Sequence, residues 1–138
     1  MRLSGKSSIG FGNRVHDNPK LSIGDQSFVG HNCGFLVAQS IRIGDHCLLA
    51  GGVRLSDFDG HPIAHDARRE DQPYSPSNVK PIVIGNDVWI GAGVYVMKGV
   101  HIGDRSIIGA GSVVTKNIPA DVIAAGNPAR VIKSLADM

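Results

Sequence analysis

The sequence predicts an all-β solenoid, in which short strands wind into triangular coils that stack on one another. The first observation is a six-residue period of large aliphatic residues, unbroken over Ile84, Ile90, Val96, Ile102, Ile108 and Val114. The second is the composition: glycine is abundant at 18 residues and aromatics make up 5%, so branched aliphatic side chains must fill the core. A period of six fits neither an amphipathic helix nor an alternating strand. It fits a short strand plus a turn, with one inward aliphatic residue on each side of the coil.

The same period runs through the first part of the chain in three shorter sets. The inward positions are Leu3, Ile9 and Val15, then Ile23, Val29 and Phe35, then Ile43, Leu49 and Leu55. The segments IGDQSFVG and IGDHCLLA are offset by twenty residues, so they are one unit repeated, with two extra residues at a corner. An antiparallel β-sandwich is the alternative, but its strands alternate with a period of two.

Small residues recur four positions after an inward aliphatic residue. They are Ser27, Cys33, Cys47, Ser106 and Ser112. We therefore expect both cysteines to be small buried turn residues. Two cysteines do not make a disulfide framework of the kind found in small secreted domains.

Composition and charge exclude two classes of partner. The net charge of +2 and the scattered basic residues argue against nucleic-acid binding. No apolar run approaches the length of a membrane span, and the start MRLSGKSSIG does not have the pattern of a signal peptide. We therefore expect a cytoplasmic protein that does not contact a membrane.

The period is lost after Leu55 and returns at Ile84. Residues 62–81 are polar, contain four prolines and show no sixfold step, which predicts a projecting loop. His61 stands where the chain leaves the solenoid wall. A histidine at the base of such a loop is suited to act as a general base in a groove beside the coils.

The expected domain organisation follows from these boundaries. The solenoid domain spans residues 1–127 and is interrupted by the projecting loop 62–81. The segment NPARVIKSLADM follows, and Pro128 suits the first position of a helix. The sequence therefore predicts a short C-terminal helix or tail over residues 128–138, covering the open end of the last coil.

Two stretches of the chain carry a family resemblance. DGHPIAHDARREDQPYSPSNVKPIVIGNDVWIGAGV, followed by IGAGSVVTKNIPADVIAAGNPARVIK, resembles the hexapeptide-repeat acyltransferases. Among these it is most similar to the maltose and galactoside O-acetyltransferases and to acetyltransferases of surface-polysaccharide synthesis. The resemblance implies a left-handed parallel β-helix, and a homotrimer with active sites between subunits. It also implies transfer of an acetyl group from acetyl-CoA to a hydroxyl of a sugar or glycan.

The resemblance also implies roles for individual residues. His61, the histidine of the GHP motif, corresponds to the catalytic base. Asp59 or Asp57 can orient it by accepting its second N–H, and a role in stabilising the turn is the alternative for both. Backbone N–H groups near Gly91 and Ala92 are expected to stabilise the oxyanion. The residues expected to bind acetyl-CoA are Trp89, Gly91, Ala92, Ala110, Thr115, Lys116 and Arg130. Of these, Lys116 and Arg130 would meet phosphates. Asn32 and Cys33 are expected near the acceptor, and no metal is expected.

Four alternatives remain open at this point. The acceptor group can be an amine of an amino sugar. A gamma-type carbonic anhydrase holds zinc with three histidines, for which the chain offers His31, His61 and His65. The first interval is longer in that family than the thirty residues between His31 and His61. A non-catalytic trimeric scaffold would not need His61, and an enzyme that forms an acetyl-cysteine would use Cys33 as its nucleophile.

Overall fold

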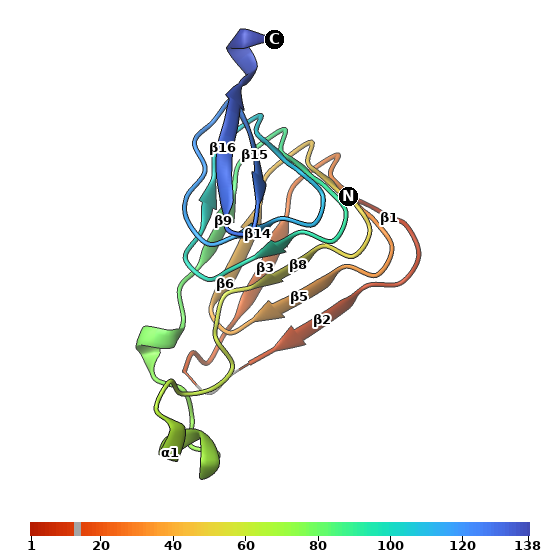
Figure 1. Cartoon of the computed structure of the whole chain (residues 1–138). Coiled ribbons are helices and arrows are strands. Elements are labelled where there is room, and N and C mark those ends of the chain that lie inside the picture. Colours follow the sequence, from red (N-terminus) through yellow and green to blue (C-terminus); the bar gives the residue numbers. More distant parts are fainter. Residues whose placement is uncertain (13–14) are drawn as a thin grey trace.

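The computed structural model describes residues 1–12 and 15–138. It is a β-helix of three stacked parallel sheets, which form the sides of the triangular coils in Figure 1. The predicted fold class is confirmed.

The three sheets differ in length. Sheet A contains, in spatial order, β1 (Arg2–Leu3), β4 (Phe28–Val29), β7 (Leu48–Leu49), β10 (Trp89–Ile90), β13 (Ile107–Ile108), β15 (Val122–Gly126) and β16 (Ala129–Ser134). Sheet B contains β14 (Val113–Val114), β11 (Tyr95–Val96), β8 (Arg54–Ser56), β5 (Gly34–Val37) and β2 (Ser8–Phe11). Sheet C contains β12 (His101–Ile102), β9 (Ile82–Ile84), β6 (Ser40–Ile43) and β3 (Lys20–Ile23).

The core is a ladder of the residues at the sixfold positions. Those that are no more than 2% exposed are Val29, Phe35, Ile43, Leu49, Leu55, Ile84, Ile90, Val96, Ile102, Ile108 and Val114. Each pairs in register with its counterpart in the next coil, as Leu49 does with Ile90. The ladder ends at the first coil, where Leu3 is 54% and Ile9 53% exposed, because the structure has no coil beneath them.

The expected row of small turn residues is confirmed. Ser27, Cys33, Cys47, Ser106 and Ser112 are all no more than 1% exposed. Ser27 shows why they are small and polar: its hydroxyl donates to Gly44 O at 2.8 Å and accepts from Cys47 N at 3.0 Å, which joins successive turns. Both cysteines are free thiols, and burial raises the pKa of each.

The segment between β8 and β9 leaves the stack of coils. Figure 1 shows it projecting from one corner, with α1 (His65–Arg69) at its far end. α1 buries none of its residues, and a second short helix, η1 (Pro76–Asn78), lies on the return path. No helix of the described residues is long and apolar enough to cross a membrane.

The C-terminal segment differs from the expected helix beginning at Pro128. Residues Ala129–Ser134 form β16, which pairs antiparallel with β15; Gly126, the last residue of β15, has a φ of +110° directly before the turn. Only Leu135–Asp137 form a helical turn, the 3-10 helix η2. The physical reason is that β15 ends sheet A and would otherwise leave an unpaired edge, for which β-branched Val131 and Ile132 are suitable strand residues.

Candidate active site

The outer face of sheet B lies between two corners of the coils. Because its strands are parallel and in register, residues that precede them share one corner and residues that follow them share the next. The leading corner consists of residues 31–32, 51–52, 92–93 and 110–111. The trailing corner consists of residues 38–39, 57–81, 97–99 and 115–117. The sheet thus brings together turns that are far apart in the sequence.

Most of the expected site residues lie at these two corners. Those at the leading corner are Asn32, Ala92 and Ala110, and those at the trailing corner are Asp59, His61, Thr115 and Lys116. The strands of sheet B run from one corner to the other and form the face between them. The register therefore places His61, Thr115 and Lys116 along one edge of the outer face of sheet B, and Asn32, Ala92 and Ala110 along the other edge.

His61 is exposed at the base of the projecting loop. It follows Gly60, whose φ of +88° is a conformation that glycine adopts readily. Within residues 1–12 and 15–138, no hydrogen bond or ion pair joins its imidazole to another group, so both ring nitrogens are open to a substrate. In the same residues, no three His, Cys, Asp or Glu side chains group closely enough to hold a metal ion.

Asp57 anchors the chain below the loop and is not available to His61. Its side chain is fully buried, and its carboxylate accepts backbone N–H bonds from Ala38 at 2.7 Å, Gln39 at 2.8 Å and Ser40 at 2.7 Å. Two of these donors belong to the trailing corner of the preceding coil, and the third, Ser40, begins β6 directly after it. Of the two roles considered for Asp57, the structure supports stabilisation of the turn and not orientation of the histidine.

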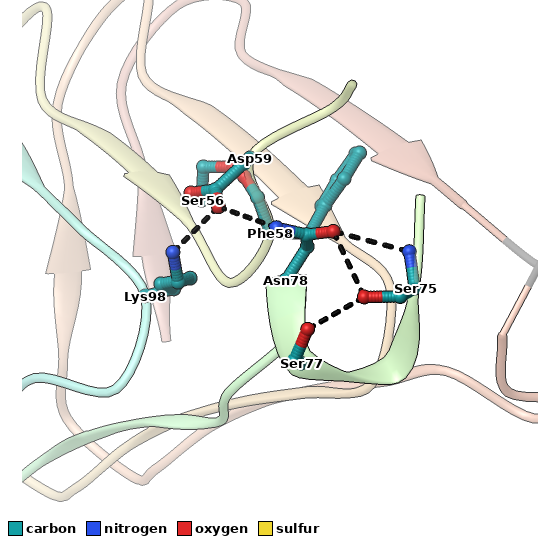
Figure 2. Close-up of polar contacts among 7 residues, drawn as sticks. All are labelled: Ser56, Phe58, Asp59, Ser75, Ser77, Asn78 and Lys98. Carbon is teal, nitrogen blue, oxygen red and sulfur yellow. Dashed lines mark hydrogen bonds and ion pairs between the residues drawn. The ribbon is translucent and has the colours of Figure 1, made fainter. Parts of the chain in front are cut away.

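Asp59 forms an ion pair at the root of the loop, shown in Figure 2. Its Oδ2 accepts from Lys98 Nζ at 2.5 Å and from Asn78 Nδ2 at 3.2 Å. Asn78 is in turn held by Ser75, whose N–H and hydroxyl donate to Asn78 Oδ1 at 3.1 and 3.2 Å. The carboxylate that we expected to hold His61 directly thus holds the loop root instead.

Sequence reasoning missed Lys98, although the register contains a signal for it. Leu55 pairs with Val96, so Lys98, two residues after Val96, is level in the register with Asp57, two residues after Leu55. A lysine at that position of the next coil is therefore directly beside the loop root. Its side chain is 26% exposed, as is that of Asp59, so solvent screens the pair only in part.

The outgoing and returning chains of the loop are joined next to this ion pair. Phe58 forms an antiparallel bridge with Val79, and Lys80 N donates to Asp57 O at 2.9 Å. The ring of Phe58 also lies 5.2 Å from that of Tyr74, measured between centroids. The loop is thus fastened at its root, two residues before His61.

Lys116 and Arg130 lie in one open depression at the β14 end of the solenoid. The residues that line it are Lys116, Asn117, Ile118, Ala129, Arg130 and Val131. Lys116 comes from the trailing corner and Arg130 from β16, and both are exposed. Two cations on a shallow surface suit phosphate groups, because charge-assisted hydrogen bonds to phosphate are strong.

At the leading corner, the backbone N–H of Ala92 is available as a hydrogen-bond donor. Gly91 N donates to Ile108 O at 2.8 Å within the sheet, so this N–H is not free for an oxyanion, contrary to our expectation. Ala92 is exposed, and its carbonyl accepts from Gly111 N at 2.8 Å. In the part of the chain that the structure describes, the N–H of Ala92 makes no such bond. It is the better candidate for contact with a ligand.

Cys33 cannot contact an acceptor. Its side chain is fully buried, its Sγ donates to Ala50 O at 3.2 Å, and burial raises its pKa, which disfavours the reactive thiolate. The adjacent Asn32 is exposed, with a φ of +59°. Of the two residues expected near the acceptor, only Asn32 faces solvent.

Trp89 lies on the outer face of sheet A rather than sheet B. It is 50% exposed and pairs with Leu48 on one side and Ile107 on the other. Its outward orientation follows from its position one residue before the inward Ile90. It therefore does not share the surface between the two corners with the other expected residues.

Two family models match the chain on either side of the projecting loop. The model described as "Bacterial transferase hexapeptide (six repeats)" matches residues 81–116. The model described as "Hexapeptide repeat of succinyl-transferase" matches residues 20–56.

Relatives cover nearly the whole chain. The galactoside O-acetyltransferase of Escherichia coli (strain K12) is 43% identical over 127 residues, which are 92% of this chain and 57% of that protein. A maltose O-acetyltransferase from Clostridium difficile 630 has a similar structure, with a TM-score of 0.77 at 37% identity over 97% of this chain and 69% of that one. A hexapeptide-repeat acetyltransferase from Vibrio cholerae O1 biovar eltor, solved with acetyl coenzyme A, gives a TM-score of 0.77 at 33% identity over 97% and 70%. The chain spans about half the length of the curated relatives that it matches.

Proposed function

The chain belongs to the hexapeptide-repeat sugar O-acetyltransferase family, and from this premise we propose that it transfers an acetyl group from acetyl-CoA to a hydroxyl of a sugar or glycan. The observation that carries the proposal is that His61, Thr115 and Lys116 lie at the trailing corner of sheet B and Ala92 at its leading corner, so that all four border the same outer face. These residues come from three coils, those of β8, β11 and β14, and the inward ladder does not require any of them.

The proposed reaction is a direct transfer. His61 accepts the proton of the acceptor hydroxyl while the oxygen forms a bond to the thioester carbonyl carbon. The carbon–sulfur bond then breaks, and the leaving thiolate takes the proton from the imidazolium. The products are the O-acetyl sugar and CoA, and His61 returns to its neutral form. The exposed imidazole with two open nitrogens supports this role.

The cofactor is proposed to lie along the same face. Lys116 and Arg130 bind its phosphates in the depression that they share. The exposed peptide groups of Ala92 and Ala110 pair with the amides of the pantetheine arm, and Thr115 lies beside Lys116. Asp59 supports His61 through the loop root, because its carboxylate is held by Lys98 and Asn78.

The proposed assembly is a homotrimer with active sites between subunits. Support comes from the outer face of sheet A, where a stripe of apolar side chains crosses five strands in register. The stripe consists of Phe28, Leu48, Trp89, Ile107 and Ile123. Apolar surface of this kind is typical of subunit contacts. The free thiols and the use of acetyl-CoA favour a cytoplasmic location.

Titration calorimetry with acetyl-CoA tests the cofactor without needing the acceptor. We expect one site per chain, and we expect Lys116→Ala/Arg130→Ala to weaken binding by at least about tenfold, since each cation contributes a charge-assisted bond. The matched control is Lys20→Ala/Arg42→Ala, which removes two exposed cations from sheet C. Absence of binding to the unsubstituted protein at millimolar acetyl-CoA would refute the proposed function.

The His61→Ala substitution tests the base. We expect acetyl transfer to fall about 100- to 10,000-fold, which is the usual contribution of general-base assistance. The affinity for acetyl-CoA and the thermal unfolding midpoint should not change, because the side chain is exposed and forms no hydrogen bond or ion pair within the described residues. Steady-state kinetics with the best acceptor of a sugar panel provide the measurement. A loss below about tenfold would exclude general-base catalysis by His61.

A further inference from the structure

A second depression lies in the middle of the outer face of sheet B. The residues that line it are Ser8, Gly34, Leu36, Arg54, Leu55 and Tyr95. Four of them form a row across neighbouring strands, because Ser8 pairs with Gly34, Gly34 with Arg54, and Arg54 with Tyr95. Ser8 and Gly34 have small side chains, whereas Arg54 and Tyr95 have large ones. The depression lies over the small residues of this row.

Arg54 lies down in this depression over Gly34. A Cβ atom on Gly34 would overlap Nη1 of Arg54 and lie 3.0 Å from its Cδ, so the space that glycine leaves is filled by the arginine. The residue is half-buried. Among residues 1–12 and 15–138, its guanidinium has no hydrogen-bond or ion-pair partner. A partly desolvated guanidinium without a counter-charge is a binding site for a carboxylate or phosphate, which it can meet with two parallel hydrogen bonds.

The position of the depression connects it to the proposed chemistry. β8 carries Arg54 and leads through Asp57 and Asp59 to His61, while β11 carries Tyr95 three residues after Ala92. The depression thus lies between the leading corner with Asn32 and the trailing corner with the base. The cation pair proposed for the phosphates of CoA is elsewhere, at the β14 and β16 end of the solenoid. Arg54 is therefore not needed for the cofactor.

We propose that the acceptor is an anionic sugar whose carboxylate or phosphate is bound by Arg54. Tyr95 flanks the same depression and offers the sugar ring an aromatic face and a hydroxyl group. This inference rests on the proposed function, since it names the acceptor class of the same site. It adds two residues that determine specificity, neither of which takes part in bond making.

Binding of sugar probes to the CoA-saturated protein tests the proposal without knowledge of the reacting hydroxyl. The probes are methyl glucosiduronate, glucose 6-phosphate and neutral methyl glucoside, each titrated by calorimetry. We expect at least one anionic probe to bind at least about tenfold more tightly than the neutral one, because a bidentate charge-assisted pair is gained. The preferred probe distinguishes a carboxylate from a phosphate. Equal or weaker binding of both anions would overturn the inference.

Two substitutions locate the preference at Arg54. Arg54→Gln should remove the preference for the anion, and Gly34→Ala should weaken it while keeping the charge, because the new methyl group displaces the guanidinium. Arg42→Gln, an exposed arginine on sheet C, is the matched control. If Arg54→Gln weakens acetyl-CoA binding and not sugar binding, the residue serves the cofactor and the inference is wrong.

If acetyl-CoA binds but no anionic probe does, the inference fails while the proposed function stands. If acetyl-CoA does not bind, the proposed function fails, and the sugar titrations repeated without CoA still decide the role of Arg54.

Discussion

At the scale of single residues, the acidic side chains around the GHP motif have separate tasks. Asp57 satisfies three backbone N–H groups of the preceding coil, while Asp59 joins the loop root to Lys98 and Asn78. The two carboxylates are two residues apart in the sequence, and they differ in burial. Asp57 has no exposed surface, whereas the side chain of Asp59 is 26% exposed.

We expect Asp57→Ala to reduce the free energy of unfolding by about 3 kcal/mol, because it leaves three buried or half-buried donors without an acceptor. Urea unfolding followed by circular dichroism, at one fixed protein concentration, measures the change. Asp137→Ala, at an exposed acid, is the control. A change within about 0.5 kcal/mol would be that of an ordinary surface substitution and would contradict the anchoring role.

At the scale of elements, the projecting loop is fixed at its root and exposed at its tip. The root consists of the ion pair Asp59–Lys98, the bridge between Phe58 and Val79, and Asn78, which is 6% exposed. At the tip, α1 has no buried residue. His61 lies close to the root, so the contacts made there determine the direction in which the histidine leaves the solenoid.

We expect Lys98→Met to loosen the loop root, because Asp59 loses its cation. Amide exchange at Asp59 and Lys80 should become about two- to fivefold faster, which corresponds to the contribution of a partly exposed ion pair. In kinetic assays kcat should fall while the affinity for acetyl-CoA is unchanged, and Lys98→Arg should behave like the unsubstituted protein. The control is Lys20→Met, on sheet C. Unchanged exchange at both amides would show that the root does not depend on the ion pair.

The elements also show which parts of the fold the sequence could predict. The inward ladder from Val29 to Val114 was predictable because every coil imposes the same constraint on one residue in six. β16 was not, because the period stops before it and the need to pair the edge of β15 becomes visible only in three dimensions. The partner of Asp59 was equally hidden, since a loop outside the period gives no register for Asn78.

The candidate site was predictable to a different degree. The family resemblance singled out His61, Ala92 and Lys116, and the register determines the corner of sheet B at which each of them lies. The burial of Cys33 follows from the same register, which also favours Asn32 as the exposed neighbour. Asn78, the partner of Asp59 on the loop, lies on a chain path outside the repeat, and sequence spacing does not determine such a contact.

At the scale of the whole molecule, the three outer faces differ in character. Sheet A carries the apolar stripe, sheet B lies between the corners that hold the candidate site, and sheet C presents exposed polar residues such as Lys20, Arg42 and His101. Subunits that pack through sheet A would leave the charged face in water. This distribution supports an assembly in which sheet A forms the subunit contact, sheet B borders the candidate site and sheet C faces solvent.

We expect Trp89→Glu to convert the proposed trimer into monomers, because a charge at the centre of the apolar stripe would be desolvated in the subunit contact. Sedimentation velocity measures the change, and Arg42→Glu on sheet C is the control. Binding of acetyl-CoA should weaken in the same variant if the site lies between subunits. A protein that remains trimeric with Trp89→Glu would place the contact on another face.

The alternation along β8 has a consequence for protein engineering. Arg54 faces outward and Leu55 inward, so adjacent residues of one strand have different roles: Arg54 is proposed to bind the acceptor, and Leu55 packs in the core. The same division holds in β11, where Tyr95 faces outward and Val96 inward. A library that varies only the outward positions of sheet B can therefore search for new acceptors while every residue of the ladder is kept. The scaffold would tolerate such diversification much better than an active site built from core residues.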